Sequence, residues 1–270
     1  SQLEMVPVAG ISPVADILLQ RLISTPADTL PTRQVWYAGD RRGLLFLKNS
    51  LGIDLKKLAE SGNHIWSPDD LIVWMPGGAI ISERTGEIAR QALEKGAALL
   101  AFVPQRDTLP PKISSPPLYG PAMEYKNQVY VLQVKKPRGY KGPTGRFIKM
   151  ALVDHENSLT RGLSNAQFFR TSSRRGIKKL ADYEIIGGKN GWQTLARPGV
   201  IAWRQKGKSL QVILTIVRGP GNKIQGSYQD ILHELLTNMG AVSRDPKVLL
   251  SEELDRQSSF TTVNLRPYCN

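Results

Sequence analysis

The residues best suited to acid–base chemistry are Asp154 and His155, a carboxylate followed directly by an imidazole. Such a pair serves as a general acid–base unit when the carboxylate orients the imidazole. Side chains of adjacent residues point to opposite sides of an extended chain, however, and these two come at the end of a predicted strand. We therefore favour a role for His155 in holding a loop, and we keep the pair as the catalytic candidate.

Metal and cofactor sites have little support in the sequence. The single cysteine, Cys269, excludes an intrachain disulfide and a cysteine-based metal site. The three histidines are scattered, without two ligands spaced along one helix face. Residues 138–146 form a basic, glycine-rich segment that suits anions but lacks the Gly-Lys-Ser/Thr ending of a P-loop. We predict no metal and no cofactor.

The net charge of +13 would attract a polyanion, but the charge is spread along the chain. The densest basic cluster follows Phe168 and Phe169, which could stack on bases or sugars. We favour a solvated loop with two core phenylalanines over nucleic-acid binding, with an anionic glycan as the intermediate alternative. The basic cluster consists of Arg170, Arg174, Arg175, Lys178 and Lys179.

Five tryptophans offer flat ring faces for stacking on sugars. Trp74 and Trp203 lie inside predicted strands, where core positions are expected, and Trp36 is ambiguous. Trp66 and Trp192 lie near predicted loops. We therefore expect these two to be the tryptophans that contact a ligand at the surface.

The elements that must position these residues alternate between strand and helix. Apolar runs predict strands over residues 34–38, 70–75 and 97–103. Leucines at spacings of three and four predict a helix over residues 44–58, with Gly52 as a point where it can break. Ser82 is a suitable N-cap for a helix whose apolar face ends before Gly96. Alternation of this kind, with apolar strands throughout, predicts a parallel sheet covered on both faces.

The flanking and closing segments are predicted in the same way. A Ser-Pro pair suits the start of an N-terminal helix, residues 104–121 are a proline-rich loop, and residues 138–146 are a solvated loop. Short apolar runs joined by Gly207 predict a hairpin, and a helix follows. The expected elements are a helix over residues 12–22, strands over 127–135, 147–153, 199–203 and 210–217, and a helix over 227–240.

Several of these segments resemble class I glutamine amidotransferase-like domains. Residues 70–78, Asp-Leu-Ile-Val-Trp-Met-Pro-Gly-Gly, with the glycine-led run at 96–101, are similar to the core of such domains. Asp154-His155 and residues 158–164 resemble a His-Pro-Leu-Thr-x-Gly-Leu element, with Glu156-Asn157 in place of the proline. Residues 192–215 look like the closing hairpin, and residues 232–241 look like the final helix.

The resemblance implies a flavodoxin-like three-layer α/β sandwich with a mostly parallel sheet, antiparallel closing strands and an N-terminal helix. It also implies three parts: an N-terminal helix and linker over residues 1–33, the α/β domain over 34–243, and a tail over 244–270. The tail looks like the opening strand of a β-sandwich module. Domains of this type accompany glycoside hydrolases, including β-galactosidase-like enzymes, where they mediate assembly.

An active class I amidotransferase needs a cysteine on a strained turn after a strand, activated by a distant histidine. The equivalent place here is Phe102-Val103-Pro104, which holds neither cysteine nor serine. We therefore expect a non-catalytic domain of a carbohydrate-active protein, serving assembly or substrate positioning. The expected partners are carbohydrate, other domains of the same protein, or a second copy of the chain, rather than nucleic acid.

Two alternatives stay open beside this reading. The first is a hydrolase with a site at the carboxyl ends of the strands, where open α/β sheets bind ligands. Its candidate binding residues are Asp40, Gly77, Gly78 and Arg106. The second is a basic module for an anionic glycan or nucleic acid. The first ten residues show no signal-peptide pattern and no run is long enough to span a bilayer, so a bacterial cytoplasmic or extracytoplasmic location stays open.

Overall fold

The computed structural model describes residues 32–76, 81–103, 123–137, 140–142, 145–170, 172–173, 176–177, 179–216 and 226–243. The predicted N-terminal helix and the tail lie outside the described residues. Four helices and strands of the first half were predicted close to where they occur. They are β1 (Gln34–Gly39), β3 (Asp70–Met75), α4 (Glu83–Glu94) and β4 (Ala98–Phe102).

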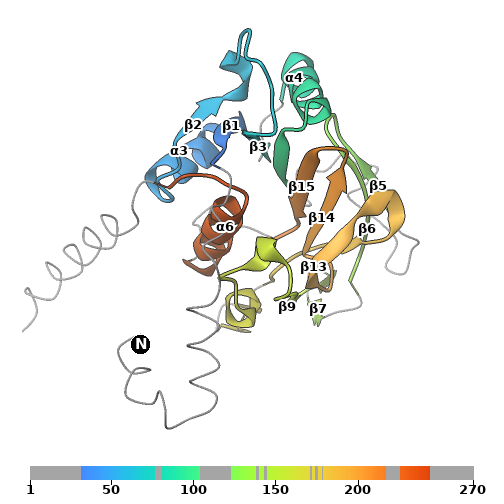
Figure 1. The fold of residues 1–270 in the computed structure, drawn as a ribbon. Coiled ribbons are helices and arrows are strands. Elements are labelled where there is room, and N and C mark those ends of the chain that lie inside the picture. The colour runs from blue at the N-terminus through green and yellow to red at the C-terminus, as the bar shows by residue number, and fades with distance from the viewer. Residues whose placement is uncertain are drawn as a thin grey trace, which may run out of the picture. The chain divides into compact units, whose positions relative to one another are not determined.

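The central sheet has eight strands in the order β2-β1-β3-β4-β15-β14-β13-β9 (Figure 1). The first five in this order run parallel, and the last three join them antiparallel. This confirms the predicted α/β fold with a mostly parallel sheet and antiparallel closing strands. The further strands are β2 (Leu55–Lys57), β9 (Leu152–Val153), β13 (Gln193–Arg197), β14 (Ile201–Lys206) and β15 (Ser209–Leu214).

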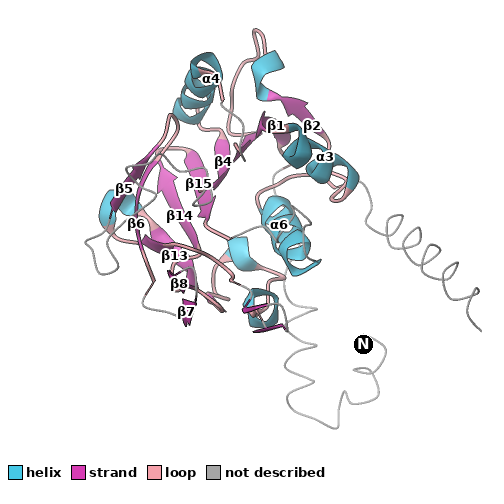
Figure 2. Ribbon diagram, turned by 180° about the vertical axis from the view of Figure 1, so that it is seen from behind, coloured by secondary structure: helices cyan, strands magenta, loops and turns pink. Residues whose placement is uncertain are grey.

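Two hydrophobic cores cover the two faces of this sheet, because successive residues of a buried strand point to opposite sides. In β1, Val35 and Tyr37 belong to one core, whereas Trp36 and Ala38 belong to the other. The first core contains residues of α3 (Arg41–Asn49) and α6 (Gly226–Asn238). Figures 1 and 2 show these two helices on the same side of the sheet.

The second core lies between the sheet and α4 together with a small antiparallel sheet. Ala89 and Ala92 of α4 are fully buried there, and Ile88 and Leu93 pack against this core, so the predicted inner face of this helix is confirmed. The result is three layers: α3 and α6, the eight-stranded sheet, then α4 with the small sheet. The small sheet has the order β12-β6-β5 and consists of β12 (Glu184–Ile186), β6 (Val131–Lys135) and β5 (Met123–Lys126).

The predicted helix over residues 44–58 is wrong in its second half. Helix α3 ends at Asn49, and Gly52 takes a φ of 63°, a left-handed conformation that glycine adopts without strain. The chain then forms β2 beside β1 and a 3-10 turn, η2 (Leu58–Glu60). The leucine spacing was misleading because Leu55 and Leu58 are buried by this strand and turn rather than by a helix face.

The region after residue 135 also differs from the prediction. The expected solvated loop at 138–146 and strand at 147–153 are replaced by a hairpin, short bridges and 3-10 turns. Glycine and proline mark this segment as a turn region, but its pairing partners are fixed by tertiary contacts. The elements are β7 (Tyr140–Gly142), β8 (Gly145–Phe147), η4 (Ser158–Thr160), η5 (Asn165–Phe168), β10 (Ser172–Ser173), β11 (Gly176–Ile177) and η6 (Lys189–Gly191).

The closing hairpin of β14 and β15 is confirmed, with Lys206 paired to Ser209 around a two-residue turn. Gly207 has a φ of 59°, as tight hairpin turns of this length require. The pairing of β15 to β4 places this hairpin against the parallel strands. Helix α6 follows, and its Leu232, Leu235 and Leu236 are buried in the first core.

Candidate functional site

A cavity of about 680 Å³ lies at the carboxyl end of β1. Its volume is within the range of small-molecule sites, about 300–1,000 Å³. Strand β1 leads into α3 on one face of the sheet, whereas β3 leads into α4 on the other. Connections that diverge in this way leave a crevice between neighbouring strands, which is where open α/β sheets bind ligands. The lining residues are Tyr37, Ala38, Gly39, Asp40, Arg41, Leu44, Lys57, Ala59, Ile81, Ser82 and Thr85.

Local sequence explains how the cavity wall is built. Asp40 is the N-cap of α3 and accepts a hydrogen bond from the Gly43 N–H at 2.7 Å. Ser82 caps α4 by accepting from the Thr85 N–H at 3.2 Å. The Tyr37 hydroxyl donates to the Asp40 carbonyl at 2.8 Å. Both helices therefore begin at the cavity, and their caps fix its polar rim.

Glycine is required at the end of β1 because two backbones approach closely. A Cβ at Gly39 would overlap the Met75 carbonyl oxygen and the Tyr37 hydroxyl. A Cβ at Gly43 would overlap the same hydroxyl. These contacts bring the ends of β1 and β3 close together beside the cavity.

The charged groups of the wall are two cations and one carboxylate. Arg41 is exposed, and the structure shows no ion pair between it and any carboxylate in the described part of the chain. Lys57 pairs with Glu60 at 2.7 Å, but both side chains are more than half exposed, so the pair contributes little. The wall can therefore accept an anion, and the second oxygen of Asp40 can accept a hydroxyl donor.

The end of β4, where an amidotransferase would carry its nucleophile, holds apolar side chains. Phe102 and Val103 are both buried, and Val103 belongs to the core on the α4 face. The Val103 N–H donates to the Leu214 carbonyl at 2.9 Å, which continues the pairing of β4 with β15. This position is packed and carries no nucleophilic group.

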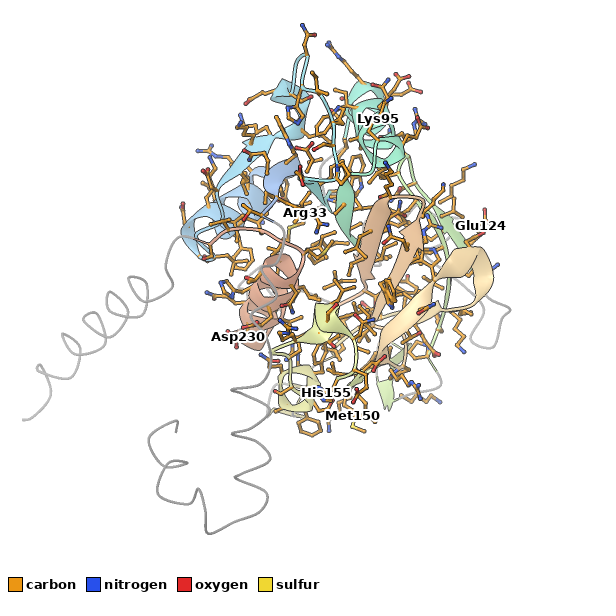
Figure 3. The ribbon with its side chains drawn as sticks, viewed as in Figure 1. Arg33, Lys95, Glu124, Met150, His155 and Asp230 are labelled. Atoms are coloured by element: carbon orange, nitrogen blue, oxygen red, sulfur yellow. The ribbon has the colours of Figure 1, made fainter. Side chains whose placement is uncertain are left out.

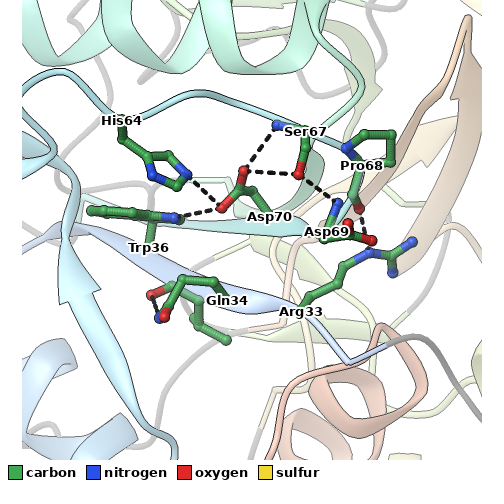
Figure 4. Close-up of polar contacts among 9 residues, drawn as sticks. Arg33, Gln34, Trp36, His64, Ser67, Pro68, Asp69 and Asp70 are labelled. Atoms are coloured by element: carbon green, nitrogen blue, oxygen red, sulfur yellow. Dashed lines mark hydrogen bonds and ion pairs between the residues drawn. The ribbon is translucent and has the colours of Figure 1, made fainter.

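A second polar cluster lies at the opposite, amino ends of β1 and β3 (Figure 4). Asp70 is only 2% exposed, and its carboxylate accepts from the Trp36 Nε1–H at 2.8 Å and the Ser67 N–H at 2.9 Å. His64 Nε2 lies 2.9 Å from the same carboxylate and must donate, because a carboxylate only accepts. The ring of His64 also packs on Trp36 and Trp66.

This His–Asp pair is built to hold a loop rather than to carry out catalysis. In a hydrolytic triad the carboxylate orients the histidine and a nucleophile approaches its other nitrogen. Here the nearby hydroxyl, Ser67 Oγ, lies 3.4 Å from Asp70 and bonds to that carboxylate instead. The cluster ties residues 61–69 to β1 and β3. Sequence reasoning missed it because Trp36 and Asp70 are 34 positions apart.

Arg33 closes the same end of the sheet on its other side. Its Nε donates to the Pro68 carbonyl at 3.0 Å, and its NH1 donates to the Met239 carbonyl at the end of α6 at 2.5 Å. Burial lowers the pKa of Arg33, and the nearby Asp69 carboxylate opposes that shift. A cation at a helix C-terminus is favourable, so Arg33 joins α6 to the strand ends.

The catalytic candidates Asp154 and His155 are both exposed, in the turn after β9. Asp154 Oδ1 accepts from the Glu156 N–H at 3.3 Å, as in a turn-stabilising contact. The structure describes both side chains and shows no hydrogen bond or ion pair between them. Figure 3 places His155 at the end of the molecule that also carries Met150.

The expected surface position of Trp192 is wrong. Trp192 is 1% exposed, its Nε1–H donates to the Val131 carbonyl at 3.0 Å, and the Arg204 guanidinium lies 4.2 Å from its ring centre. Partial burial lowers the pKa of Arg204. Trp66 is half-buried against Trp36, so it keeps part of its surface. Trp74 is buried as predicted, and Trp203 is only partly so.

The basic cluster is not a solvated loop throughout. Arg170 is buried, donates to the Gln167 carbonyl at 3.1 Å, and has its pKa lowered by burial. Lys179 pairs with Asp182 at 2.8 Å. Phe168 is core as predicted, whereas Phe169 is 48% exposed, contrary to the prediction. The candidates Arg106, Gly77, Gly78, Arg174, Arg175 and Lys178 lie outside the described residues.

No three His, Cys, Asp or Glu side chains in the described part of the chain gather as metal ligands do. In the same residues, no helix is long and apolar enough to cross a lipid bilayer.

Comparisons with known proteins give a likeness of structure and none of sequence. No protein-family model matches the sequence, and no curated protein matches it. Among solved structures, the chain is similar to the exo-beta-1,4-mannosidase Op5Man5 from Opitutaceae bacterium strain TAV5, with a TM-score of 0.38 and 8% identity. The match covers 85% of this chain and 40% of the mannosidase chain, so this chain spans well under half the length of that enzyme.

Proposed function

We propose that this chain is a non-catalytic, amidotransferase-like domain of a larger carbohydrate-active protein, in which it docks against another domain. The assignment to the amidotransferase-like group is supported by the sheet, whose parallel strands are followed by antiparallel closing strands as the resemblance implies. It is also supported by the sequence motifs at residues 70–78 and 96–101. The observation that carries the non-catalytic part is the buried, apolar end of β4, with Val103 where a nucleophile would stand.

A docking role is supported by an exposed apolar surface at one edge of the sheet. The Ala151 N–H donates to the Phe168 carbonyl, and the Arg170 N–H donates to the Lys149 carbonyl. These contacts bring two short segments side by side along β9, the last strand of the sheet. Three large apolar side chains of these segments are about half exposed, and we name them the β9 patch: Met150 at 53%, Leu152 at 56% and Phe169 at 48%.

Apolar side chains gathered at a sheet edge are typical of protein contact sites. We expect the partner to be another domain of the same protein with an apolar surface. The Lys149 ammonium lies 5.5 Å from the Phe169 ring centre, at the margin of the β9 patch. The carbohydrate-active context comes from the domain type that the sequence motifs resemble.

The coding sequence around residues 1–270 is the first test, since a glycosidase domain in the same reading frame is expected. The second test uses that longer protein with Leu152→Lys, and with Leu45→Lys as the matched control on α3, where Leu45 is 43% exposed. We expect Leu152→Lys to separate one calorimetric unfolding transition into two, and Leu45→Lys to leave it single. Equal behaviour of the two variants would refute docking through the β9 patch.

The non-catalytic part is tested with the chain alone. We expect no release of ammonia from glutamine and no hydrolysis of nitrophenyl glycosides. Turnover that is lost on a single substitution at Asp40, Asp154 or His155 would overturn the proposal and favour a hydrolase instead. Turnover that survives all three substitutions and is removed by further purification comes from a contaminant, and it leaves the proposal standing.

A further inference from the structure

The cavity at the carboxyl end of β1 has the composition of a binding site, and the proposed docking role does not use it. It lies over β1, whereas the β9 patch is at the other edge of the eight-stranded sheet. Its wall combines apolar groups with a rim of charged and hydroxyl groups, the usual composition of small-molecule sites. From this wall we propose that the cavity binds a small hydroxylated anion, a sugar ring bearing a carboxylate or a phosphate.

The anionic part of the ligand follows from the charges. Arg41 and Lys57 contribute two positive charges to the wall, against one negative charge from Asp40. The structure gives Arg41 no carboxylate partner among the described residues, so its guanidinium is free to form two parallel hydrogen bonds with a carboxylate or phosphate. Lys57 is held only by an exposed pair with Glu60, which an anion can replace at little cost.

The hydroxylated part follows from the acceptor on the same rim. One oxygen of Asp40 is occupied by the Gly43 N–H, which leaves the other oxygen to accept from a ligand hydroxyl. Ser82 Oγ lies 2.8 Å from Thr85 Oγ1, so this pair can share one further hydrogen bond with a ligand hydroxyl. Leu44 and Ile81 supply apolar wall for the ring carbons. The groups are held on the first turns of two helices, so the site is formed before a ligand arrives.

Titration calorimetry of the full chain with D-glucuronate, D-glucose 6-phosphate and D-glucose tests this inference. We expect at least one of the two anions to bind and the neutral sugar to bind about tenfold more weakly or not at all. Binding of glucuronate alone identifies a carboxylate ligand, and binding of the 6-phosphate alone identifies a phosphate ligand. Failure of both anions at millimolar concentration, or equal binding of glucose, overturns the proposal.

Two variants locate the binding. Arg41→Gln should weaken binding of the anion about tenfold, whereas Arg42→Gln, an exposed neighbour on the same helix that does not line the cavity, should change it less than about twofold. Ala59 is exposed and lines the cavity, so Ala59→Phe should block binding without altering the fold. Equal weakening by Arg41→Gln and Arg42→Gln, or undiminished binding to Ala59→Phe, would show that the anion binds elsewhere. Circular dichroism of each variant checks that it is folded.

Discussion

Replacement of Asp70 by alanine should destabilise the fold more than any other single change at the amino ends of the strands. The carboxylate is almost completely buried and accepts hydrogen bonds from the Trp36 indole, the Ser67 amide and the His64 ring. Alanine would leave the first two donors without an acceptor in a place that water reaches poorly. The His64 side chain is 31% exposed, so it can turn toward solvent and loses little.

The expected cost follows from the number of donors that are left without a partner. A buried donor without an acceptor costs ~1–3 kcal/mol, so the indole and the amide together give about 2–6 kcal/mol. Asp70→Asn keeps the shape and one acceptor oxygen but loses the charge, so we expect about 1–2 kcal/mol. His64→Ala removes only the partly exposed ring donor of His64 and should cost about 1 kcal/mol or less. Since native domains are stable by ~5–15 kcal/mol, Asp70→Ala should remain folded unless this domain lies at the low end of that range.

Urea unfolding followed by tryptophan fluorescence measures these differences, because Trp36 and Trp66 report directly on the loop. A double-mutant cycle of Trp36→Phe with Asp70→Asn isolates the indole–carboxylate bond, and we expect a coupling energy of about 1 kcal/mol. If the free energy of unfolding of Asp70→Ala lies within about 0.5 kcal/mol of the value for the unaltered protein, the network does not hold the loop. Strict additivity in the cycle would refute the indole contact itself.

Three further changes test the packing and the titrating groups. Gly199→Ala should cost about 1–3 kcal/mol in urea unfolding, because a Cβ there would overlap the backbone of Ile185. Tyr130 donates to the Phe102 carbonyl, and burial raises its pKa well above the ordinary 10.0. The folded state therefore retains that proton longer than the unfolded state, so stability falls above pH 10. Burial also raises the pKa of Tyr125, which contributes to the same fall, so Tyr130→Phe should reduce the fall and cost about 1 kcal/mol at pH 7. Partial burial raises the pKa of Asp230, so the free energy of unfolding falls as the pH rises through the carboxyl range. Asp230→Asn removes this titrating group. Its gain in stability over the unaltered protein should therefore be larger at pH 7 than at pH 3.

The central layer could be predicted because its signals are local. Strands β3 and β4 are continuous apolar runs bounded by glycine and proline, and α4 combines a serine cap with an apolar face. The hairpin of β14 and β15 is indicated by the glycine at its turn. In these segments the local preference of the sequence agrees with the tertiary environment. The spacing of apolar residues and the helix caps were therefore sufficient to predict them.

Segments defined by distant partners could not be predicted in this way. Strand β2 is only three residues long and contains two lysines, and it exists because β1 offers an unpaired edge. Trp192 follows a glycine-rich turn, which suggests the surface, yet it is buried and its indole donates to the Val131 carbonyl, 61 positions earlier. Arg170 stands in a basic run, but its side chain is buried and its backbone N–H donates to the Lys149 carbonyl of a distant segment. In each case a long-range contact decides against the local pattern.

The two ends of the parallel strands differ in the way that stability and binding require. At the amino ends, Asp70 and Arg33 join strands, loop and α6 through hydrogen bonds that leave their buried groups satisfied. At the carboxyl ends, the helix caps consume only part of the polar groups, so Arg41 and one oxygen of Asp40 remain for a ligand. Variants at Asp70 should therefore lower the free energy of unfolding without changing the affinity for an anion. Variants at Arg41 should lower the affinity for an anion without changing the free energy of unfolding. This separation distinguishes a binding cavity from a gap left by packing.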